Sequence, residues 1–325
     1  MKLVKKILNK LNGLHYPQEY LCFAKESFSD PLHVYFVSAN KVIKDITNHH
    51  LFTGYSPLIF ALPPFNEINL SQAENITISF AEAAFRPNET LSKKDVLATI
   101  HLKKMHHKLA DHNTIYFYRG IEAEHRFANS FYQFIIQLGN NLFNRKPGNV
   151  FLPGNLYKQV QVAYAVPRKI SLITIKQGIL FNLFPTDLHG QIDEGHYLIS
   201  LRRGGKAAQQ VETTKKIIIS EIDSAFYKTA YSLGKNHMQE LKSRDQFPFS
   251  SDLSEILGIA LPQSVLCYRE LELFDSSDHG IHRLFLFKII RSRQIENKPA
   301  TLSHIHNVYA TWRHNKGLSG NYLLR

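Results

Sequence analysis

The stretch Val166–Ile219 reads VPRKISLITIKQGILFNLFPTDLHGQIDEGHYLISLRRGGKAAQQVETTKKIII. It contains three short runs of branched and aromatic residues: Ile170–Ile175, Ile179–Phe184 and Tyr197–Leu201. Glycine, proline and polar turn formers bound these runs, which is the pattern of β-strands. Three strands in close succession are therefore predicted at this point of the chain.

Polar clusters follow the second and third of these strands. Pro185, Thr186 and Asp187 come directly after the second, and the segment Arg202–Lys206 (RRGGK) comes directly after the third. Hydroxyls, free backbone N–H groups and fixed cations at the ends of adjacent strands are the groups that bind phosphate. We therefore predict a site for a phosphate-bearing cofactor at these strand ends.

The order of these pieces resembles the flavin reductase family, whose core is the FMN-binding split barrel. In that family an Asn-x-x-Pro-Ser/Thr segment follows one strand, and a Lys-Asp-Thr segment follows the next and opens a helix. Asn182, Pro185 and Thr186 match the first segment. Lys206 matches the second, but Ala207 and Ala208 stand where Asp-Thr would be.

The resemblance covers about residues 155–315, roughly half of the chain. The segment Tyr231–His237 (YSLGKNH) stands where the family has a glycine-containing segment before a short helix. The segment Leu266–Ile295 resembles the family's closing hairpin, with its turn predicted at Asp278–Ile281.

The resemblance implies a cofactor and a set of residues that contact it. The cofactor would be FMN, with FAD as the alternative, and NADH or NADPH would be the co-substrate that supplies a hydride. No catalytic side chain is assigned, because the groups that hold the flavin ring in this family are largely backbone N–H donors. Thr174, Asn182 and Thr186 would line the ring and ribityl chain, Lys206 with Arg203 would hold the phosphate, and Pro185, Asp187 and His282 complete the expected site. For His282, a solvent-facing hairpin histidine is the competing interpretation.

Three functions compete at this point. The first is an FMN-binding oxidoreductase of flavin reductase type, which would make the chain a flavoprotein enzyme. The second is a split barrel that has lost flavin chemistry and serves as a binding or interaction module, because Ala207 and Ala208 replace Asp-Thr. The third is a basic RNA- or membrane-binding protein. The resemblance also implies a homodimer, since the flavin site of that family commonly lies at a subunit interface.

Bulk properties set the fold class. The 325 residues favour two domains, which we place at 1–150 and 151–325. The predicted fold is mainly β with helices (α+β), with the split β-barrel in the second domain. A content of 39 Lys and Arg against 27 Asp and Glu attracts anionic partners without choosing among them. Two lone cysteines, Cys22 and Cys267, argue for a reducing compartment and so for the cytoplasm. Apolar runs are only strand-length, so no transmembrane segment is expected.

Residues 1–150 form an α+β domain to which the sequence assigns no role. Strands are predicted at His33–Ser38, Pro57–Leu62 and Asn75–Phe80, and a helix at Leu91–Leu109. A gapless shift of 139 residues lays Thr47 on Thr186 and His50 on His189, and lays several of the strands on one another. This raises the hypothesis that the first half is a degenerate second barrel. An interface between barrels would then lie within one chain, and the protein would be a monomer.

The remaining motifs are weak. Seventeen histidines invite a metal hypothesis, but His101 and His106 are five residues apart, and no HExxH occurs. Basic segments such as Lys103–Lys108 carry no recognisable nucleic-acid module. The first 13 residues predict a short basic amphipathic helix, for which docking on the protein itself is favoured over membrane attachment. Asp252 is predicted to begin a short helix that ends at Gly258.

Overall fold

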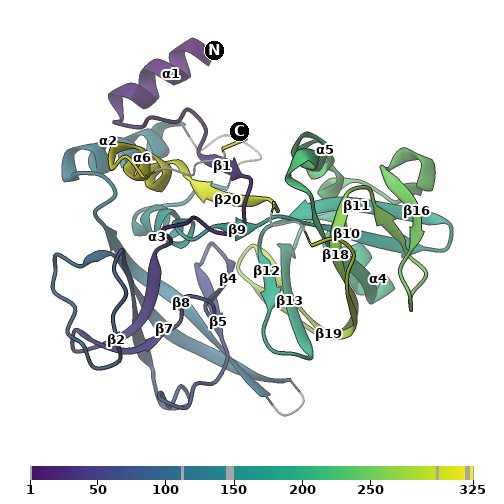
Figure 1. The fold of residues 1–325 in the computed structure, drawn as a ribbon, viewed down its shortest axis with the longest axis horizontal. Helices are drawn as coiled ribbons and strands as arrows, with labels where there is room; N and C mark the ends of the chain where they lie inside the picture. The colour runs from purple at the N-terminus through teal and green to yellow at the C-terminus, as the bar shows by residue number, and fades with distance from the viewer. Residues whose placement is uncertain (1, 111–112, 144–149, 298–299, 319–322, 325) are drawn as a thin grey trace.

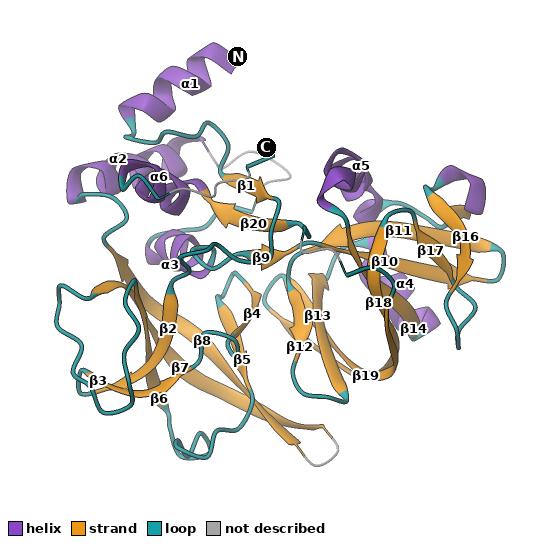
Figure 2. Ribbon diagram, in the orientation of Figure 1, coloured by secondary structure: helices purple, strands orange, loops and turns teal. Residues whose placement is uncertain are grey.

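The computed structural model describes residues 2–110, 113–143, 150–297, 300–318 and 323–324. Two antiparallel sheets, one from each half of the chain, stand side by side (Figure 1). Figure 2 shows that helices gather over one end of the first sheet. The predicted fold class, mainly β with helices, is confirmed.

The first sheet contains seven strands from residues 33–125. They are β2 (His33–Ser38), β3 (Lys41–Asp45), β4 (Leu51–Gly54), β5 (Ile59–Leu62), β6 (Asn75–Ala81), β7 (Val96–Ala110) and β8 (Asn113–His125). Their order across the sheet is β3-β2-β6-β7-β8-β5-β4. The predicted strands at His33–Ser38, Pro57–Leu62 and Asn75–Phe80 correspond to β2, β5 and β6.

The second sheet is formed by residues 171–294. Its strands are β10 (Ser171–Gln177), β11 (Leu180–Thr186), β12 (His189–Gln191), β13 (His196–Arg202), β14 (Lys216–Ile222), β15 (Lys242–Ser243), β18 (Val265–His279) and β19 (His282–Gln294). Their order is β12-β13-β19-β18-β14-β10-β11-β15. Three predicted strands are thereby confirmed as β10, β11 and β13, and the closing hairpin as β18 and β19.

Seven strands of each sheet follow one common order. When the strands of each set are numbered along the chain from first (β2 or β10) to seventh (β8 or β19), the first sheet has the order 2-1-5-6-7-4-3. The second sheet, without its edge strand β15, has the order 3-4-7-6-5-1-2, which is the same order in the opposite direction. In the second sheet, helix α4 (Lys206–Thr214) connects the fourth strand, β13, to the fifth, β14. In the first sheet, a loop without a helix connects the corresponding strands, β5 and β6.

The strand registers also correspond. Val34 of β2 pairs with Phe80 of β6, and Ile173 of β10 pairs with Ile219 of β14, so both partners are displaced by the same 139 positions. The turns between the first two strands agree as well, because the pair Ser38–Lys41 and the pair Gln177–Leu180 differ by that same number.

Buried apolar side chains join the two sheets. Strands β5 and β8 of the first sheet share one cluster with β13 and β19 of the second, and it includes Ile59, Phe117, Leu198 and Leu284. Each fully buried side chain of this kind contributes about 1.5–3 kcal/mol. The two halves therefore separate only at a large free-energy cost.

Two small sheets and the helices complete the fold. One has two strands, β16 (Phe249–Leu253) and β17 (Ala260–Pro262), and the other pairs β1 (Tyr20–Phe23) with β20 (Ser303–His306), and β20 with β9 (Arg168–Lys169). The helices outside the second sheet are α1 (Lys2–Leu11), α2 (Ser130–Phe143), α3 (Asn155–Ala163) and α6 (Asn307–Asn315). Val308, Tyr309 and Trp312 of α6 pack in the core of the first half. The C-terminal helix therefore belongs structurally to the N-terminal sheet.

Two predicted helices are wrong. Residues 96–110 form strand β7, in which Ala98, Ile100 and Leu102 are buried at a period of two. Ser92 and Asp95 have the spacing of a helix cap, and the Ser92 N–H does donate to Asp95 over 2.8 Å, but this hydrogen bond closes a turn before the strand. The helix predicted at 252–258 is also absent, because residues 252–253 end strand β16 (Phe249–Leu253) and residues 254–258 lie in the connection to β17 (Ala260–Pro262).

The N-terminal helix is confirmed as α1, but the preferred docking on the protein itself is not supported for the residues near its end. Ile7 is 53% exposed and Leu11 is 65% exposed. Leu3 and Val4, which the amphipathic pattern also includes, lie outside the residues whose side chains are described.

Candidate functional site

A cavity of about 300 Å³ opens where β11, β13 and α4 meet. Its walls come from the end of β11, the end of β13, the first turn of α4, the start of β19 and a loop of the first half. The lining includes Tyr55, Pro185, Thr186, Asp187, Ser200, Leu201, Arg202, Gly205, Ala207, His237 and His282. This is the position at which the sequence predicts a cofactor site.

The segment after β13 brings the start of α4 to this cavity. A Cβ added to Gly205 would lie 3.1 Å from the carbonyl oxygen of Arg202 and 3.3 Å from that of His237, so a larger residue would require this tight turn to shift by a few tenths of an ångström. Helix α4 then begins at Lys206, as predicted, and Ala207 and Ala208 are almost fully buried in the core. The N-terminus of α4 therefore presents backbone N–H groups and partial positive charge at the cavity wall.

Two buried polar side chains of the lining have no partner among the described residues. His282 is 2% exposed, and neither of its ring nitrogens has a hydrogen bond there. Ser200 is 3% exposed, and its hydroxyl also has none. A buried polar group without a partner costs about 1–3 kcal/mol. Such groups at a cavity wall point to a ligand that hydrogen-bonds them.

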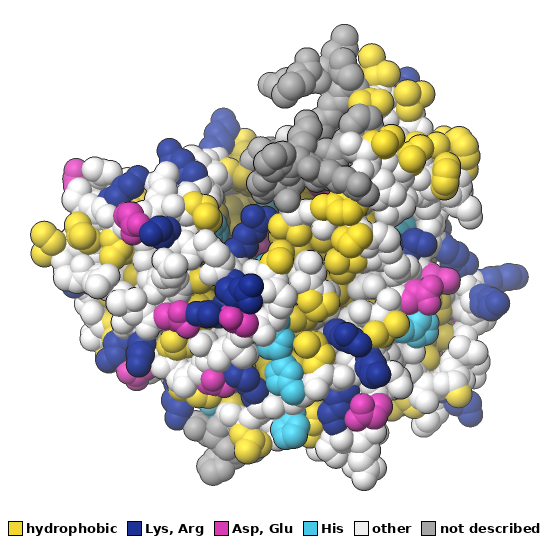
Figure 3. All heavy atoms as spheres, turned by 180° about the vertical axis from the view of Figure 1, so that it is seen from behind, with side chains coloured by type: hydrophobic (Ala, Val, Ile, Leu, Met, Phe, Trp, Pro, Cys, Tyr) yellow, Lys and Arg dark blue, Asp and Glu magenta, His cyan; other side chains and the backbone are white. Residues whose placement is uncertain are grey.

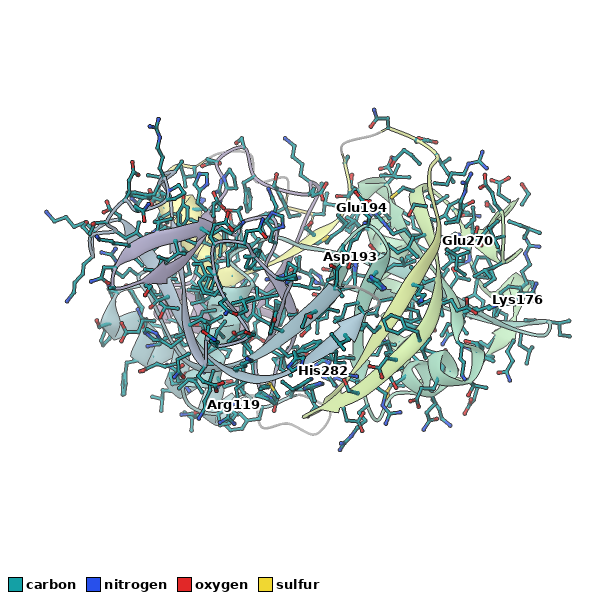
Figure 4. The ribbon with its side chains drawn as sticks, turned by 90° about the horizontal axis from the view of Figure 1, so that it is seen from below. Arg119, Lys176, Asp193, Glu194, Glu270 and His282 are labelled. Carbon is teal, nitrogen blue, oxygen red and sulfur yellow. The ribbon has the colours of Figure 1, made fainter. Side chains whose placement is uncertain are left out.

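His282 lies at the junction of the two sheets (Figure 4). The ring of Tyr55 from the first half packs edge-on against it, with 4.8 Å between the ring centroids. Burial and then the nearby Arg202 lower the pKa of His282 to about 4, so its ring is neutral near pH 7. A neutral imidazole offers a ligand one donor and one acceptor.

The structure brings four of the predicted residues together, because Pro185, Thr186, Asp187 and His282 all line the cavity. Thr174 and Asn182 lie outside this lining. Thr174 is fully buried in β10. Asn182 donates hydrogen bonds to the Gln210 side chain over 2.7 Å and to the Asn236 carbonyl over 3.1 Å. Asn182 of β11 is thus hydrogen-bonded both to α4 and to the 3₁₀ segment Leu233–Met238.

The two predicted phosphate-binding cations contact carboxylates. Lys206 Nζ lies 2.6 Å from Glu240 Oε1, and both side chains are largely exposed. Arg203 Nη1 lies 3.7 Å from Asp278 Oδ2. Arg202, the residue just before Arg203, lines the cavity instead. The cationic cluster is therefore present at the site, but Arg202 is its member at the cavity wall.

Asp187 faces the cavity from the end of β11 with a defined set of partners. Tyr164 Oη donates to its carboxylate over 3.1 Å, and His304 Nδ1 lies 2.8 Å from the same oxygen. Burial alone would raise the pKa of Asp187, but the hydrogen bond and charge of His304 outweigh burial and lower it. The carboxylate is therefore ionised near pH 7.

Sequence reasoning missed Tyr55, Ser200, Arg202 and His237 as lining residues. Arg202 stands inside the predicted cationic cluster, so its neighbour Arg203 was the signal that could have identified it. Ser200 lies in β13, where His196 to Leu201 are all buried, so the sequence has no alternation that would mark Ser200 as facing the cavity. Tyr55 comes from the other half, and no local pattern marks it.

Surface and charge features outside the cavity are less specific. Lys and Arg side chains are spread over the face in Figure 3 and interspersed with Asp and Glu. In the part of the chain that the structure describes, no group of three or more His, Cys, Asp or Glu residues could hold a metal ion. The predicted helix histidines are on strand β7, where His106 stacks on His279. None of the described helices has the length and apolar character needed to cross a membrane.

Comparisons with known proteins give matches only among solved structures. No protein-family model matches the chain, and no curated protein matches its sequence. An FMN-binding protein from Thermus thermophilus is 16% identical, with a TM-score of 0.36, over 39% of this chain and 71% of that one. The NADH:FAD oxidoreductase of Streptomyces globisporus is 15% identical, with a TM-score of 0.40, over 50% of this chain and 96% of that one. The styrene monooxygenase flavin reductase of Pseudomonas putida is 12% identical, with a TM-score of 0.36, over 44% of this chain and 90% of that one. The solved structures that part of this chain resembles thus include an FMN-binding protein, an NADH:FAD oxidoreductase and a flavin reductase.

Proposed function

We propose that the cavity at the ends of β11 and β13 binds a phosphorylated flavin, and that the chain is an oxidoreductase of flavin reductase type. The observation that carries this proposal is the set of groups at the cavity wall. Unpartnered Ser200 and His282 meet there beside Arg202 and the N-terminus of α4. Hydrogen-bonding groups and positive charge at one wall suit a ligand with a polar ring and a phosphate.

The residues divide into two roles. Arg202 and the first N–H groups of α4 would hold the phosphate, because both offer positive charge and donors. Thr186, Ser200 and His282 would hydrogen-bond the polar atoms of the ring system, which would give the two buried groups their partners. Bound flavin would supply the redox chemistry itself, accepting hydride from NADH or NADPH.

The cavity, of about 300 Å³, adjoins a second one that adds to the space for a ligand. Tyr55 and Asp187 also line an adjoining cavity of about 400 Å³. Ligand sites in proteins commonly measure about 300–1,000 Å³. The two cavities together therefore leave room for a flavin and part of a second ligand.

A spectrum and a titration test this proposal. The purified protein is expected to bind FMN with a quench of flavin fluorescence, and the complex is expected to accelerate NADH or NADPH oxidation. Ser200→Ala and His282→Phe should each weaken FMN binding about two- to tenfold, which corresponds to the loss of one hydrogen bond. Absence of FMN binding by folded protein would overturn the proposal.

A second candidate function is a barrel that binds an anionic ligand without redox chemistry. The pairs Lys206–Glu240 and Arg203–Asp278 favour it, because carboxylates already contact two of the three cations of the Arg202–Lys206 segment. Such a protein would bind FMN weakly or not at all and would not oxidise NADH. The same titration and assay therefore separate the two candidates.

We further propose that the two halves are copies of one split-barrel unit, with domains at about 1–150 and 151–325. The shared strand order and the common displacement of 139 positions support this proposal. At that displacement Arg202–Lys206 (RRGGK) corresponds to Pro63–Glu67 (PPFNE), so the cationic cluster is present in the second copy alone. Thr47, the counterpart of Thr186, accepts the backbone N–H of Val34 over 2.9 Å.

This arrangement predicts one flavin per chain, because the first copy lacks the phosphate-binding groups and contributes Tyr55 to the site of the second. It also predicts a monomer rather than the homodimer that the family resemblance implies. Light scattering should give a mass near 37.4 kDa, and titration should saturate at one FMN per chain. Two bound flavins per chain, or a stable dimer, would contradict the proposal. The full chain is needed, because α6 would be lost from the first core in a truncation at residue 150.

A further inference from the structure

An exposed apolar stripe runs along α2. Phe131, Phe134, Leu138 and Leu142 are between 43% and 65% exposed, and their spacing of three and four residues keeps them on one face of the helix. The opposite face packs inward, where Ile136 lies in the core of the first half. A surface helix normally has charged and polar residues on its outer face. The sequence of α2 contains no charged residue, so this outer face has no charge of its own.

The chain just after α1 lies against α2. A Cβ added to Gly13, which has φ +68°, would lie 2.6 Å from the Tyr132 ring of α2. A Cβ added to Gly139 of α2 would lie 3.7 Å from the amide nitrogen of the Asn12 side chain. The C-terminal end of α1 is therefore held beside α2.

Together the two helices present one apolar surface. Ile7, Leu8 and Leu11 of α1 are exposed, as is the stripe of α2. These exposed apolar side chains of the two helices form the α1–α2 surface, and Figure 3 shows apolar side chains gathered at the upper right, over α1 and α2. Single exposed apolar side chains are common, but a group of this size marks a surface that binds another body.

Positive charge accompanies the apolar side chains. The sequence of α1 contains four lysines among its ten residues and no acidic residue, and Lys10 in its last turn is exposed. The whole chain has a formal net charge of +12. What binds the α1–α2 surface must therefore offer an apolar layer beside negative charge.

A second copy of the chain fits this surface poorly. A two-fold contact places the same patch of each copy against itself. It would bring the lysines of both α1 helices together, and like charges repel. A bilayer that contains anionic lipid instead offers an apolar interior beneath negatively charged headgroups. None of the described helices could cross a membrane, so the contact would be made at the membrane surface.

We propose that the α1–α2 surface attaches the chain to the surface of membranes that contain anionic lipid. Helix α1 lies among the headgroups, whose negative charge attracts its lysines, and the stripe of α2 enters the apolar layer beside it. The α1–α2 surface lies in the first half of the molecule, away from α4 (Figure 1), so the first cavity is not part of the contact. Attachment is therefore independent of the ligand that the first cavity binds.

Co-sedimentation of the full chain with vesicles tests this proposal. The chain is expected to bind vesicles of phosphatidylcholine mixed with phosphatidylserine, and to bind phosphatidylcholine alone much more weakly. Raising the salt concentration from about 0.05 M to about 0.5 M should release it, because salt screens the attraction. Phe134→Ser should weaken binding about five- to twentyfold, since it removes a large apolar side chain from the contact. Lys10→Gln should weaken it about fivefold.

Matched control variants separate the α1–α2 surface from general effects. Ile179→Ser removes an apolar side chain that is 85% exposed in the turn between β10 and β11. Lys216→Gln removes a positive charge outside α1. Both should leave vesicle binding nearly unchanged. All four changes are at exposed side chains, so each variant should unfold in denaturant at nearly the same midpoint as the wild type.

Several results would each overturn the proposal. They are no vesicle binding by folded protein, equal binding to the two kinds of vesicle, equal effects of Phe134→Ser and Ile179→Ser, and equal effects of Lys10→Gln and Lys216→Gln. A stable dimer in solution that Phe134→Ser converts to a monomer would also overturn it, because the α1–α2 surface would then be an interface between copies of the chain. Failure of FMN binding in a separate titration would bear only on the first cavity.

Discussion

Recognition of a phosphate can be isolated by comparing FMN with riboflavin, which lacks it. Arg202 lines the first cavity beside the N-terminus of α4, and a hydrogen bond to a charged group contributes about 1.5–3 kcal/mol. Arg202→Ala should therefore weaken FMN binding about tenfold to a hundredfold. The same change should alter riboflavin affinity by no more than about twofold, because riboflavin has no phosphate for the guanidinium to hold.

Lys206 should matter less than Arg202. Its Nζ lies 2.6 Å from Glu240, and an exposed pair of this kind is worth about 0–1 kcal/mol. Lys206 must leave that pair to reach a phosphate, so Lys206→Ala should weaken FMN binding by only a few fold. Glu240→Gln removes the competing carboxylate, and it should strengthen FMN binding by a similar factor.

Fluorescence titration of both flavins at fixed ionic strength gives the ratio of affinities for each variant. Lys216→Ala is the matched control, because Lys216 has an exposed partner, Glu272, at 3.4 Å and lies outside the cavity lining. Lys216→Ala removes one positive charge, as Arg202→Ala does, and should leave the ratio of the FMN and riboflavin affinities nearly unchanged. Equal losses for FMN and riboflavin in Arg202→Ala would refute the assignment of the phosphate position.

Three further predictions concern stability and are measured by denaturant unfolding. Gly280 has φ +58°, and an added Cβ would overlap the backbone oxygen of Ser56 in the other half, whereas Gly178 has φ +61° and open space around it. Gly178→Ala should lower the free energy of unfolding by roughly 1 kcal/mol through backbone strain, and Gly280→Ala should lower it by more. Equal losses in the two variants would contradict the packing between the halves. Arg313 is fully buried, with Nη2 2.6 Å from Asp30 Oδ1 and its guanidinium 3.7 Å from the Phe28 ring centroid; Arg313→Met should lower the free energy of unfolding by about 2–3 kcal/mol, less than for a fully buried pair because Asp30 is partly exposed. Burial lowers the pKa of His50 to about 3 and that of His125 to about 4. Below about pH 6.5 the unfolded chain therefore binds more protons at these histidines than the folded chain does, so the free energy of unfolding should fall as the pH drops toward 4. A free energy of unfolding that does not change over this range would contradict the burial of these rings.

Local patterns predicted the strands well where the sequence carries a period of two with turn residues at its ends. The hairpin turn at Gly178 and the strands on either side follow from such a pattern, and so does β2. The sequence favours a helix at the position of strand β7, because Ser92 and Asp95 have the spacing of a helix cap. Its inward residues Ala98, Ile100 and Leu102 alternate with polar ones, but their apolar neighbours also fit a helical period. Pairing with β6 and β8 decides the outcome, and that pairing is not local.

The site divides in the same way. Thr186, Asp187 and the start of α4 lie within one continuous stretch, so their proximity follows from strand ends and a glycine turn. Tyr55, His304 and Tyr231 reach the two cavities from three other segments, and the sequence gives no register that would bring them together. Buried partners also changed the expected roles, because Asn182 hydrogen-bonds Gln210 rather than lining the cavity. The sequence therefore predicts the polar groups at the strand ends, but it does not predict the cavity walls that are built from distant segments.

The proposed duplication explains why only one of two similar halves carries a candidate site. The connection after β5 spans residues 63–74 and the connection after β13 spans residues 203–215, so their lengths differ by only one residue. In the second half this loop contains two glycines and α4, and its backbone approaches the cavity. In the first half it contains Pro63 and Pro64, and Leu70 from the same loop is buried in the core. Proline has no backbone N–H, so this loop offers fewer donors for a phosphate than the glycine-containing loop of the second half. The first copy could lose its own site without unfolding, because its sheet is held by the shared apolar cluster and by α6. What it still supplies to the second copy is Tyr55, which covers the cavity from across the junction.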